Sequence, residues 1–198
     1  MNFIYQNENS ICPELCAEII EMYENENNKY QGKTIAGIQP KIKNTTDFTI
    51  PKNDEKWNKI EQFLYKELHK NILKYTESIN CESYRAKYNN GMESTIFTNN
   101  QLEAYNFMIQ KYDKNKGEYI YHNDFHMNSN KYRVITFLWY LNDIHEGGET
   151  EFWDSYKIKP TAGKIVLFPS SWTYPHRGKM PISDNKYIIT NWLYINYG

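Results

Sequence analysis

The chain has 198 residues, of which 40 % are hydrophobic and 16 % aromatic, and its formal net charge is −1. This length suits a single folded domain, and the aromatic content excludes a disordered chain. The near-neutral charge and the lack of long basic runs argue against nucleic acid or a membrane surface as a partner. The composition leaves the oligomeric state open.

The sequence also bears on the cellular compartment. Its first residues contain no basic segment followed by an apolar one, so we expect no secretory signal. The longest apolar runs fall well short of the ~20 residues that a transmembrane helix needs. Three cysteines, Cys12, Cys16 and Cys81, make an odd number, which favours reduced thiols over a disulfide framework. Together these features predict a cytoplasmic protein.

Two amphipathic helices are predicted in the first half of the chain. The first begins near Pro13, a favourable first residue for a helix. Its apolar face consists of Leu15, Ile19, Ile20 and Tyr23. The second follows "PKNDEKW", where Asn53 or Asp54 can cap it. Its apolar stripe consists of Trp57, Ile60, Leu64, Leu68, Ile72 and Tyr75.

The segments around these helices have weaker patterns. Residues 31–53 are polar and contain Gly and Pro, which indicates a loop with a short strand. Residues 85–103 are ambiguous, and "NNGMEST" is typical of a turn. The sequence does not decide whether a loop over residues 80–103 closes over a substrate.

From about residue 104 the pattern becomes that of a β protein. Short runs rich in β-branched and aromatic residues, such as "RVITFLWYLN", "KIVLFP" and "KYIITNWLYINY", alternate with turn signals such as "EGGE" and "PTAGK". This pattern favours an antiparallel barrel or jelly roll. We therefore predict a mainly β (α+β) single domain over residues 1–198. Residues 1–103 supply loops and helices packed on one sheet, and residues 104–198 form the jelly-roll core.

The segment "YIYHNDFHMN" concentrates potential metal ligands. It places His122, Asp124 and His126 at alternate positions in a chain with five histidines. On a strand, His122 and Asp124 would point to one side, about 6–7 Å apart. His126 would share that side only if the strand continued, and "NSNK" indicates that it ends. Two histidines and one aspartate would form the facial triad of non-haem Fe(II) oxygenases, although Zn, Mn or Ni could bind the same ligands. Taken alone, this pattern leaves surface or core histidines as the alternative.

Several motifs around this segment occur in an order that resembles a known family. They are "YDKNKGEYIYHND", "YRVITFLWYLNDIHEGGETEF", "IKPTAGKIVLFPSSWTYPHRG" and "KYIITNW". In this order they resemble the 2-oxoglutarate-dependent dioxygenases, and among them the prolyl 4-hydroxylase-like family. The resemblance covers residues 104–197, nearly half of the chain. It implies a double-stranded β-helix (jelly-roll) core, with Fe(II), 2-oxoglutarate and O₂ as cofactors and ascorbate (vitamin C) as reductant.

The resemblance also implies roles for individual residues. The positions that match the iron ligands are His122, Asp124 and His176. Lys186 matches the cation that holds the distal carboxylate of 2-oxoglutarate. Arg177, which follows His176 in the sequence, is the alternative cation, and it does not match that position. Hydroxyl groups at cosubstrate positions are those of Tyr112, Tyr140 and Thr190. Positions on the substrate side are Arg133, Tyr119 and Trp192. His126 and His145 match no functional position; we expect the first at the rim of the site and the second in solvent.

The function implied is hydroxylation of an unactivated C–H bond, with release of succinate and CO₂. The expected substrate is a prolyl residue in a peptide or protein. One alternative keeps the chemistry and changes the substrate to a free amino acid or small metabolite. Others are a non-catalytic jelly-roll binding module and a zinc hydrolase with the same ligands.

Overall fold

The computed structural model describes residues 3–79, 102–128 and 130–196, which form two helices and two antiparallel sheets. The elements in chain order are β1 (Tyr5–Asn7), α1 (Pro13–Glu24), β2 (Tyr30–Gln31), β3 (Lys43–Asn44), β4 (Thr46–Thr49), α2 (Asn58–Ile79), β5 (Glu103–Ala104), β6 (Met108–Tyr112), β7 (Glu118–His122), β8 (Lys131–Tyr140), β9 (Thr150–Phe152), β10 (Tyr156–Ile158), β11 (Ile165–Pro169), β12 (His176–Gly178) and β13 (Lys186–Asn196).

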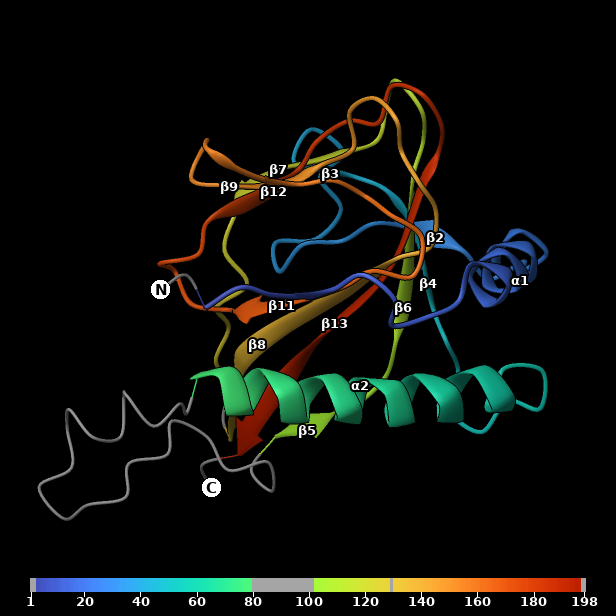
Figure 1. The fold of residues 1–198 in the computed structure, drawn as a ribbon. Helices are drawn as coiled ribbons and strands as arrows, with labels where there is room; N and C mark the ends of the chain where they lie inside the picture. Colours follow the sequence, from blue (N-terminus) through green and yellow to red (C-terminus); the bar gives the residue numbers. More distant parts are fainter. Residues whose placement is uncertain (1–2, 80–101, 129, 197–198) are drawn as a thin grey trace, which may run out of the picture.

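The two sheets face each other as the layers of a jelly roll (Figure 1). The larger sheet has eight strands in the order β1-β11-β8-β13-β6-β4-β2, with β5 also paired to β13. The smaller sheet has five strands in the order β10-β9-β12-β7-β3. Every pairing is antiparallel between strands that are mostly distant in sequence, as jelly-roll topology requires. The predicted fold class is thus confirmed.

The central strands of the larger sheet separate two cores because successive side chains point to opposite faces. On β8, Ile135, Phe137 and Trp139 belong to the core under the helices. Leu138 and Tyr140, on the opposite face, belong to the core between the sheets. Because side chains alternate along the strand, one face of β8 packs in the core under the helices and the other packs in the core between the sheets.

Both helices contribute apolar side chains to the outer core. The side chains from α1 are Cys16, Ile19 and Tyr23, and those from α2 include Leu64, Leu68, Ile72 and Tyr75. Figure 1 shows α2 running along the larger sheet on the side away from β7, β9 and β12. Its predicted apolar stripe is thus buried. The Asp54 carboxylate accepts hydrogen bonds from the backbone N–H groups of Lys56 and Trp57, which caps the turn that leads into this helix.

The segment between the helices holds more regular structure than a loop with one short strand. Strand β3 pairs with β7 in the smaller sheet, and β4 pairs with β6 in the larger one. Only Thr45 separates these two strands, so this part of the chain joins the sheets at one edge. Our expectations for Cys81, for residues 85–101 and for a closing loop at 80–103 fall outside the described residues, apart from the short strand β5.

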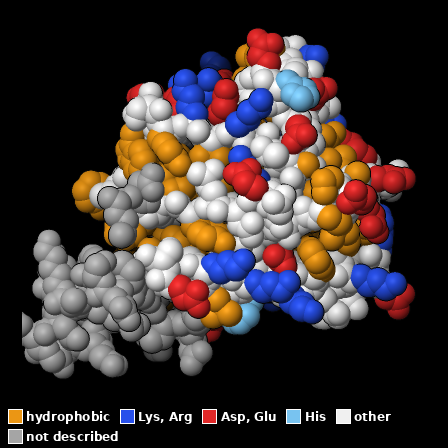
Figure 2. All heavy atoms as spheres, in the orientation of Figure 1, with side chains coloured by type: hydrophobic (Ala, Val, Ile, Leu, Met, Phe, Trp, Pro, Cys, Tyr) orange, Lys and Arg blue, Asp and Glu red, His pale blue; other side chains and the backbone are white. Residues whose placement is uncertain are grey.

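The surface is mixed in character. On the face shown in Figure 2, acidic and basic side chains are interspersed, with apolar side chains between them. Within the described ranges, neither helix combines the length and the apolar character needed to cross a bilayer.

Candidate metal and cosubstrate site

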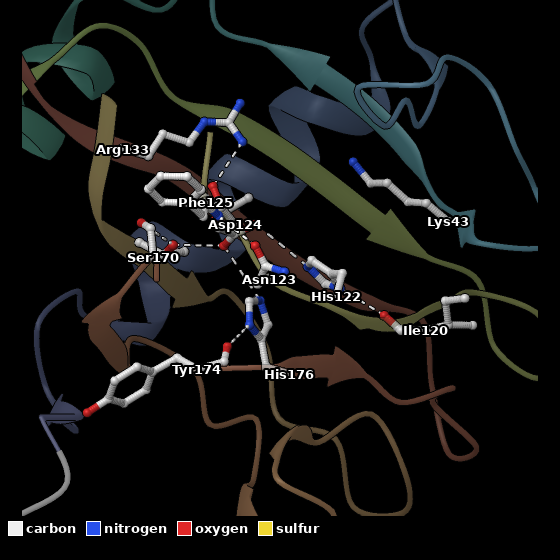
Figure 3. Close-up of polar contacts among 12 residues, drawn as sticks. Lys43, Ile120, His122, Asn123, Asp124, Phe125, Arg133, Ser170, Tyr174 and His176 are labelled. Carbon is white, nitrogen blue, oxygen red and sulfur yellow. Dashed lines mark hydrogen bonds and ion pairs between the residues drawn. The ribbon is translucent and has the colours of Figure 1, made fainter. Parts of the chain in front are cut away.

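Three potential metal ligands meet at the junction of β7 and β12. His122 ends β7, His176 begins β12, and the two residues are directly paired across these strands. Asp124 lies just beyond β7. The Nε2 atoms of His122 and His176 lie 3.7 and 3.6 Å from the two carboxylate oxygens of Asp124. One potential ligand atom from each residue lies within 4.8 Å of the other two (Figure 3).

Each histidine is held in the form that can bind a metal. The Nδ1 atom of His122 lies 2.8 Å from the carbonyl oxygen of Ile120, and that of His176 lies 3.1 Å from the carbonyl oxygen of Tyr174. A carbonyl oxygen only accepts, so each Nδ1 carries the proton and each Nε2 lone pair faces the cluster. Burial, with a smaller contribution from the charge of His176, lowers the pKa of His122 to about 3, which keeps its imidazole neutral.

The carboxylate of Asp124 is fixed from the opposite side. The hydroxyl of Thr136 lies 2.7 Å from Oδ2 and donates to it, and it lies 2.9 Å from the hydroxyl of Ser170. Burial acts to raise the pKa of Asp124, but the neighbouring His176 and His122 and the hydrogen bond from Thr136 together lower it. Asp124 is therefore an oriented anion, and Thr136 is a supporting contact that the sequence pattern did not indicate.

The donor set fits a first-row divalent metal. Imidazole nitrogen and carboxylate oxygen bind such ions at about 2.0–2.2 Å, so two atoms sharing one ion lie no more than about 4.4 Å apart. The two distances from the histidines to Asp124 are within that limit, and all three potential ligand atoms lie within 4.8 Å of one another, so a bound ion would need only a small adjustment of the side chains. Two imidazoles with one carboxylate on one side of an ion suit Fe(II) with open positions on the other side. The metal role of these residues remains a prediction that this geometry supports.

A cavity of about 580 Å³ lies between the sheets and includes all three residues in its wall. Lys186 also lines it and is 1 % exposed. Its ammonium group donates to the carbonyl oxygen of Gly148 at 3.0 Å and lies 3.9 Å from the centre of the Tyr112 ring. Burial lowers the pKa of Lys186 to about 7, and the charge of Glu149 offsets this only in part. An incoming carboxylate would relieve the cost of burying this cation.

The hydroxyl groups near Lys186 divide into two kinds. Tyr112 and Thr190 line the cavity directly. The Tyr112 hydroxyl donates to Gln110 at 3.3 Å, and the Thr190 hydroxyl donates to the carbonyl oxygen of Phe137 at 2.8 Å. Tyr140 is not part of the lining; its hydroxyl donates to Thr150 Oγ1 at 2.7 Å, and Thr150 lines the cavity. Tyr140 therefore orients the Thr150 hydroxyl by donating a hydrogen bond to it, and the Thr150 hydroxyl can in turn donate its own proton to a ligand.

The residues expected on the substrate side also line the cavity, and β-bulges bring two of them there. The pairs His176–His122 and Gly178–Tyr119 show one extra residue on β7. The pairs Leu193–Ile135 and Tyr194–Arg133 show one extra residue on β8. A bulge reverses the alternation that follows it, so Tyr119 joins His122, and Arg133 joins Thr136, on the cavity side.

These substrate-side residues are closely packed around the metal cluster. The Tyr119 ring stacks on His122, with centroids 3.5 Å apart and an angle of 12° between the rings. The Arg133 guanidinium lies 3.4 Å from the centre of the Trp192 ring, and its Nη1 approaches the carbonyl oxygen of Asp124 at 3.4 Å (Figure 3). The Trp192 Nε1 is buried and has no hydrogen-bond partner among the described residues. Trp192 nevertheless helps to lower the pKa of Asp124, so its side chain already interacts with that carboxylate.

Sequence reasoning missed a buried ion pair in the cavity wall. Lys43 Nζ lies 2.7 Å from Asp47 Oδ2, and the Thr45 hydroxyl donates to Asp47 Oδ1 at 2.7 Å. Lys43 also lies 5.6 Å from the centre of the Tyr119 ring. This pair links β3 of the smaller sheet to β4 of the larger one. The only sequence signal was a Lys and an Asp four residues apart in a segment predicted as loop.

Two other histidines of the β-rich half, and the second candidate cation Arg177, are not part of the cluster. His145 is exposed, as expected, and the half-buried His126 is not part of the metal cluster found among the described residues. Arg177 Nη2 forms an ion pair with Glu151 and is absent from the cavity lining, so of these two cations only Lys186 lines the cavity that contains the His–Asp–His cluster. The jelly roll, the three converging potential metal ligands and the buried lysine form an arrangement typical of non-haem oxygenases.

Comparison with known proteins points to the same class. Residues 107–194 match the sequence model of the 2OG-Fe(II) oxygenase superfamily. Over this segment, a little under half of the chain, the sequence is that of a 2OG-Fe(II) oxygenase domain, and this similarity implies Fe(II), 2-oxoglutarate and O₂ as cofactors. A search of curated proteins gave no match by sequence.

Solved structures of prolyl hydroxylases share the fold. One from Trichoplax adhaerens, in complex with a hypoxia inducible factor peptide fragment, has a TM-score of 0.72 at 20 % identity, covering 98 % of this chain and 84 % of that one. A Pseudomonas putida prolyl-4-hydroxylase has a TM-score of 0.66 at 16 % identity, covering 100 % and 94 %. The viral collagen prolyl hydroxylase of Paramecium Bursaria Chlorella virus-1 has a TM-score of 0.63 at 15 % identity, covering 98 % and 97 %. The fold is thus prolyl hydroxylase-like.

Proposed function

We propose that this protein hydroxylates an unactivated C–H bond of a prolyl residue in a peptide or protein. In the balanced reaction, one O₂ and one 2-oxoglutarate convert the C–H group to C–OH and yield succinate and CO₂. The observation that carries the proposal is the cavity itself. Its wall holds His122, Asp124 and His176 together with the buried cation of Lys186.

In this proposal, His122, Asp124 and His176 hold Fe(II), which when bound supplies the redox chemistry that O₂ requires. The carbonyl groups of Ile120 and Tyr174 fix the two imidazoles, and Thr136 fixes the carboxylate. These contacts hold the ligands before the metal arrives, so little ordering remains to be done on binding. The chain's own task is thus to orient the reactants and to exclude water.

Lys186 binds the distal carboxylate of 2-oxoglutarate in this scheme. A buried carboxylate needs several donors. The hydroxyls of Tyr112 and Thr150 line the same cavity as Lys186, and Tyr140 donates to Thr150 and so orients it. The Thr150 proton can be given to the carboxylate directly, whereas the Tyr112 proton would first have to leave Gln110. Burial raises the pKa of Tyr112 well above its usual value, so that hydroxyl stays a neutral donor at physiological pH. Thr190 borders the same cavity with its proton directed to the backbone.

On the substrate side, the Arg133 guanidinium is a donor suited to a peptide carbonyl group, and the Trp192 ring packs against it. Tyr119 offers an aromatic surface beside His122. The peptide bound to the Trichoplax adhaerens hydroxylase agrees with a peptide substrate for this fold. Ascorbate as reductant and a reducing, cytoplasmic location complete the proposal; Cys12 and Cys16 are both free thiols.

The test is turnover by the purified protein with Fe(II), ascorbate and 2-oxoglutarate. Three additions are compared: a proline-rich peptide, the same peptide with each proline replaced by alanine, and free proline. We expect succinate formation and the mass gain of one oxygen atom only with the proline-rich peptide. Hydroxylation of free proline alone would favour the small-metabolite alternative. Absence of succinate in every arm, with metal bound, would favour a non-catalytic binding module.

A further inference from the structure

A row of alternating aromatic and cationic side chains leads away from the metal cavity. It consists of Tyr105, Lys131, Arg133, Trp192 and Tyr194, and we call it the aromatic–cation ladder. Trp192 and Arg133 form its inner end, because both line the cavity. Tyr194 follows Trp192 by two residues on β13, and Lys131 precedes Arg133 by two on β8, so each pair shares one face of its strand.

Direct contacts connect the ladder. The Arg133 Nε donates to the Tyr194 hydroxyl at 3.4 Å. The Lys131 ammonium lies 4.9 Å from the centre of the Tyr194 ring and 3.6 Å from that of the Tyr105 ring. The two tyrosine rings meet edge to face, with centroids 5.2 Å apart. All five side chains are half-buried, so the ladder is packed and still reaches the surface.

Neither cation of the ladder is held in a direct ion pair within the described part of the chain. The Glu103 carboxylate accepts a hydrogen bond from the Tyr105 hydroxyl, and this bond, together with the weaker effect of the Lys131 charge, lowers the pKa of Glu103. Glu103 therefore offsets the charge of Lys131 only in part. An aromatic ring holds a cation in place without removing its charge or its N–H donors. The ladder therefore presents positive charges on side chains that are already held in place. Binding an anionic group costs less entropy when these side chains do not have to be ordered first.

We propose that the aromatic–cation ladder extends the substrate site and selects a peptide with an acidic side chain two residues from the residue bound at Arg133. The proposal rests on the peptide substrate proposed above. Lys131 and Arg133 are alternate residues of one strand, about 6–7 Å apart. Alternate residues of an extended peptide have the same spacing. When Arg133 contacts a carbonyl group at the reacting residue, Lys131 then lies beside the side chain two positions away.

A peptide fits this surface better than a single-stranded nucleic acid, which also binds to aromatic and cationic groups. Nucleic acid requires a groove of many cations along its backbone, and the ladder has two. The chain carries a net charge of −1, and the face in Figure 2 intersperses both signs of charge. Binding of an oligonucleotide is kept as an outcome of the test.

The experiment measures peptide binding without turnover, using protein loaded with Fe(II) and 2-oxoglutarate under nitrogen. Fluorescent proline-rich peptides carry either Glu or Gln two positions before, or two positions after, the target proline. We expect one Glu peptide to bind about fivefold more tightly than its Gln partner, the effect of a partly exposed charge pair. Lys131→Met should abolish that preference while keeping the packed stem, and Lys131→Arg should retain it.

Two further variants make the result specific. Lys131→Glu should reverse the preference, favouring a peptide with Lys at the same position, which a misfolded protein cannot do. Lys74→Gln removes an exposed lysine on α2 and should leave the preference unchanged. In turnover, Lys131→Met should raise KM for the Glu peptide with kcat unchanged. Equal binding of Glu and Gln peptides, or a preference that survives Lys131→Met, would overturn the inference.

The outcomes also separate this inference from the proposed function. Hydroxylation of Glu and Gln peptides with equal KM would leave prolyl hydroxylation intact and refute the role of Lys131. Lack of binding by every peptide would refute both. Binding of a short oligothymidylate that disappears in Lys131→Met would assign the ladder to nucleic acid and overturn the peptide proposal.

Discussion

The two faces of the β8–β13 strand pair differ in their polar side chains. The outer face, against the helices, is apolar, with Phe137 and Trp139 on β8 fully buried. The inner face holds Thr136 on β8 and Lys186 and Thr190 on β13, and it lines the cavity. One pair of strands thus supplies stability on one side and chemistry on the other. Substitutions one residue apart should therefore produce different defects.

On the cavity side, the largest effect is expected at Asp124. Asp124→Ala removes the carboxylate that lies between the two histidines, so metal binding and turnover should both be lost. The loss should exceed the roughly 10–100-fold that follows removal of a group supporting a ligand. Metal content by mass spectrometry and succinate release measure the two effects. His126→Ala removes the neighbouring histidine outside the cluster and should keep both; equal losses in the two variants would exclude Asp124 as a specific ligand.

On the outer side, Phe137→Ala should reduce stability without touching the site. Truncating a fully buried Phe costs about 3–5 kcal/mol in the free energy of unfolding, because contacts are lost and a cavity remains. Urea unfolding followed by circular dichroism should show a lower midpoint with an unchanged slope. At temperatures where the variant is folded, its affinity for 2-oxoglutarate should equal that of the natural protein. A selective loss of 2-oxoglutarate binding would show that the two faces are not independent.

The same division explains what sequence reasoning could reach. The helical stripe of α2 and the short β-rich runs predicted the layers, because burial of one face imposes a period on the sequence. The order of motifs also led to Lys186 and to the three metal-ligand candidates. Alternation by itself would have turned Tyr119 and Arg133 away from the cavity. Their placement depends on bulges, which depend on the register between strands distant in sequence.

The contacts that sequence reasoning missed are of a similar kind. The Lys43–Asp47 pair and the Tyr140–Thr150 hydrogen bond each join elements that only the folded chain brings together or orients. A segment such as residues 31–53, rich in polar residues, gives no periodic signal for strands of two to four residues. Short edge strands gain their structure from the neighbours they pair with, and those neighbours are not local in the sequence.

Lys186→Met sharpens the comparison, because it changes function and stability in opposite directions. The variant keeps the length of the side chain and removes the charge that would pair with the distal carboxylate. Its affinity for 2-oxoglutarate should fall by about 2–5 kcal/mol, since a buried carboxylate would be left without its partner. Without cosubstrate, the variant should be at least as stable as the natural protein, because no ammonium is buried. Calorimetric titration and urea unfolding test each half, and an unchanged affinity would assign the carboxylate to another cation.

The smallest effect concerns pH, and it follows from the lowered pKa of Lys186, about 7 in the free protein. A bound carboxylate raises this pKa, so binding above pH 7 requires uptake of a proton, whereas below pH 7 the lysine is already charged. With saturating metal, the dissociation constant of 2-oxoglutarate should be flat below pH 7 and rise up to about tenfold per pH unit above it. Titrations in buffers of different ionisation enthalpy count the protons taken up. Lys186→Met should show neither the slope nor the uptake. Tyr112 remains protonated in this range, so a slope that persists in the variant would contradict the assignment of the titration to Lys186.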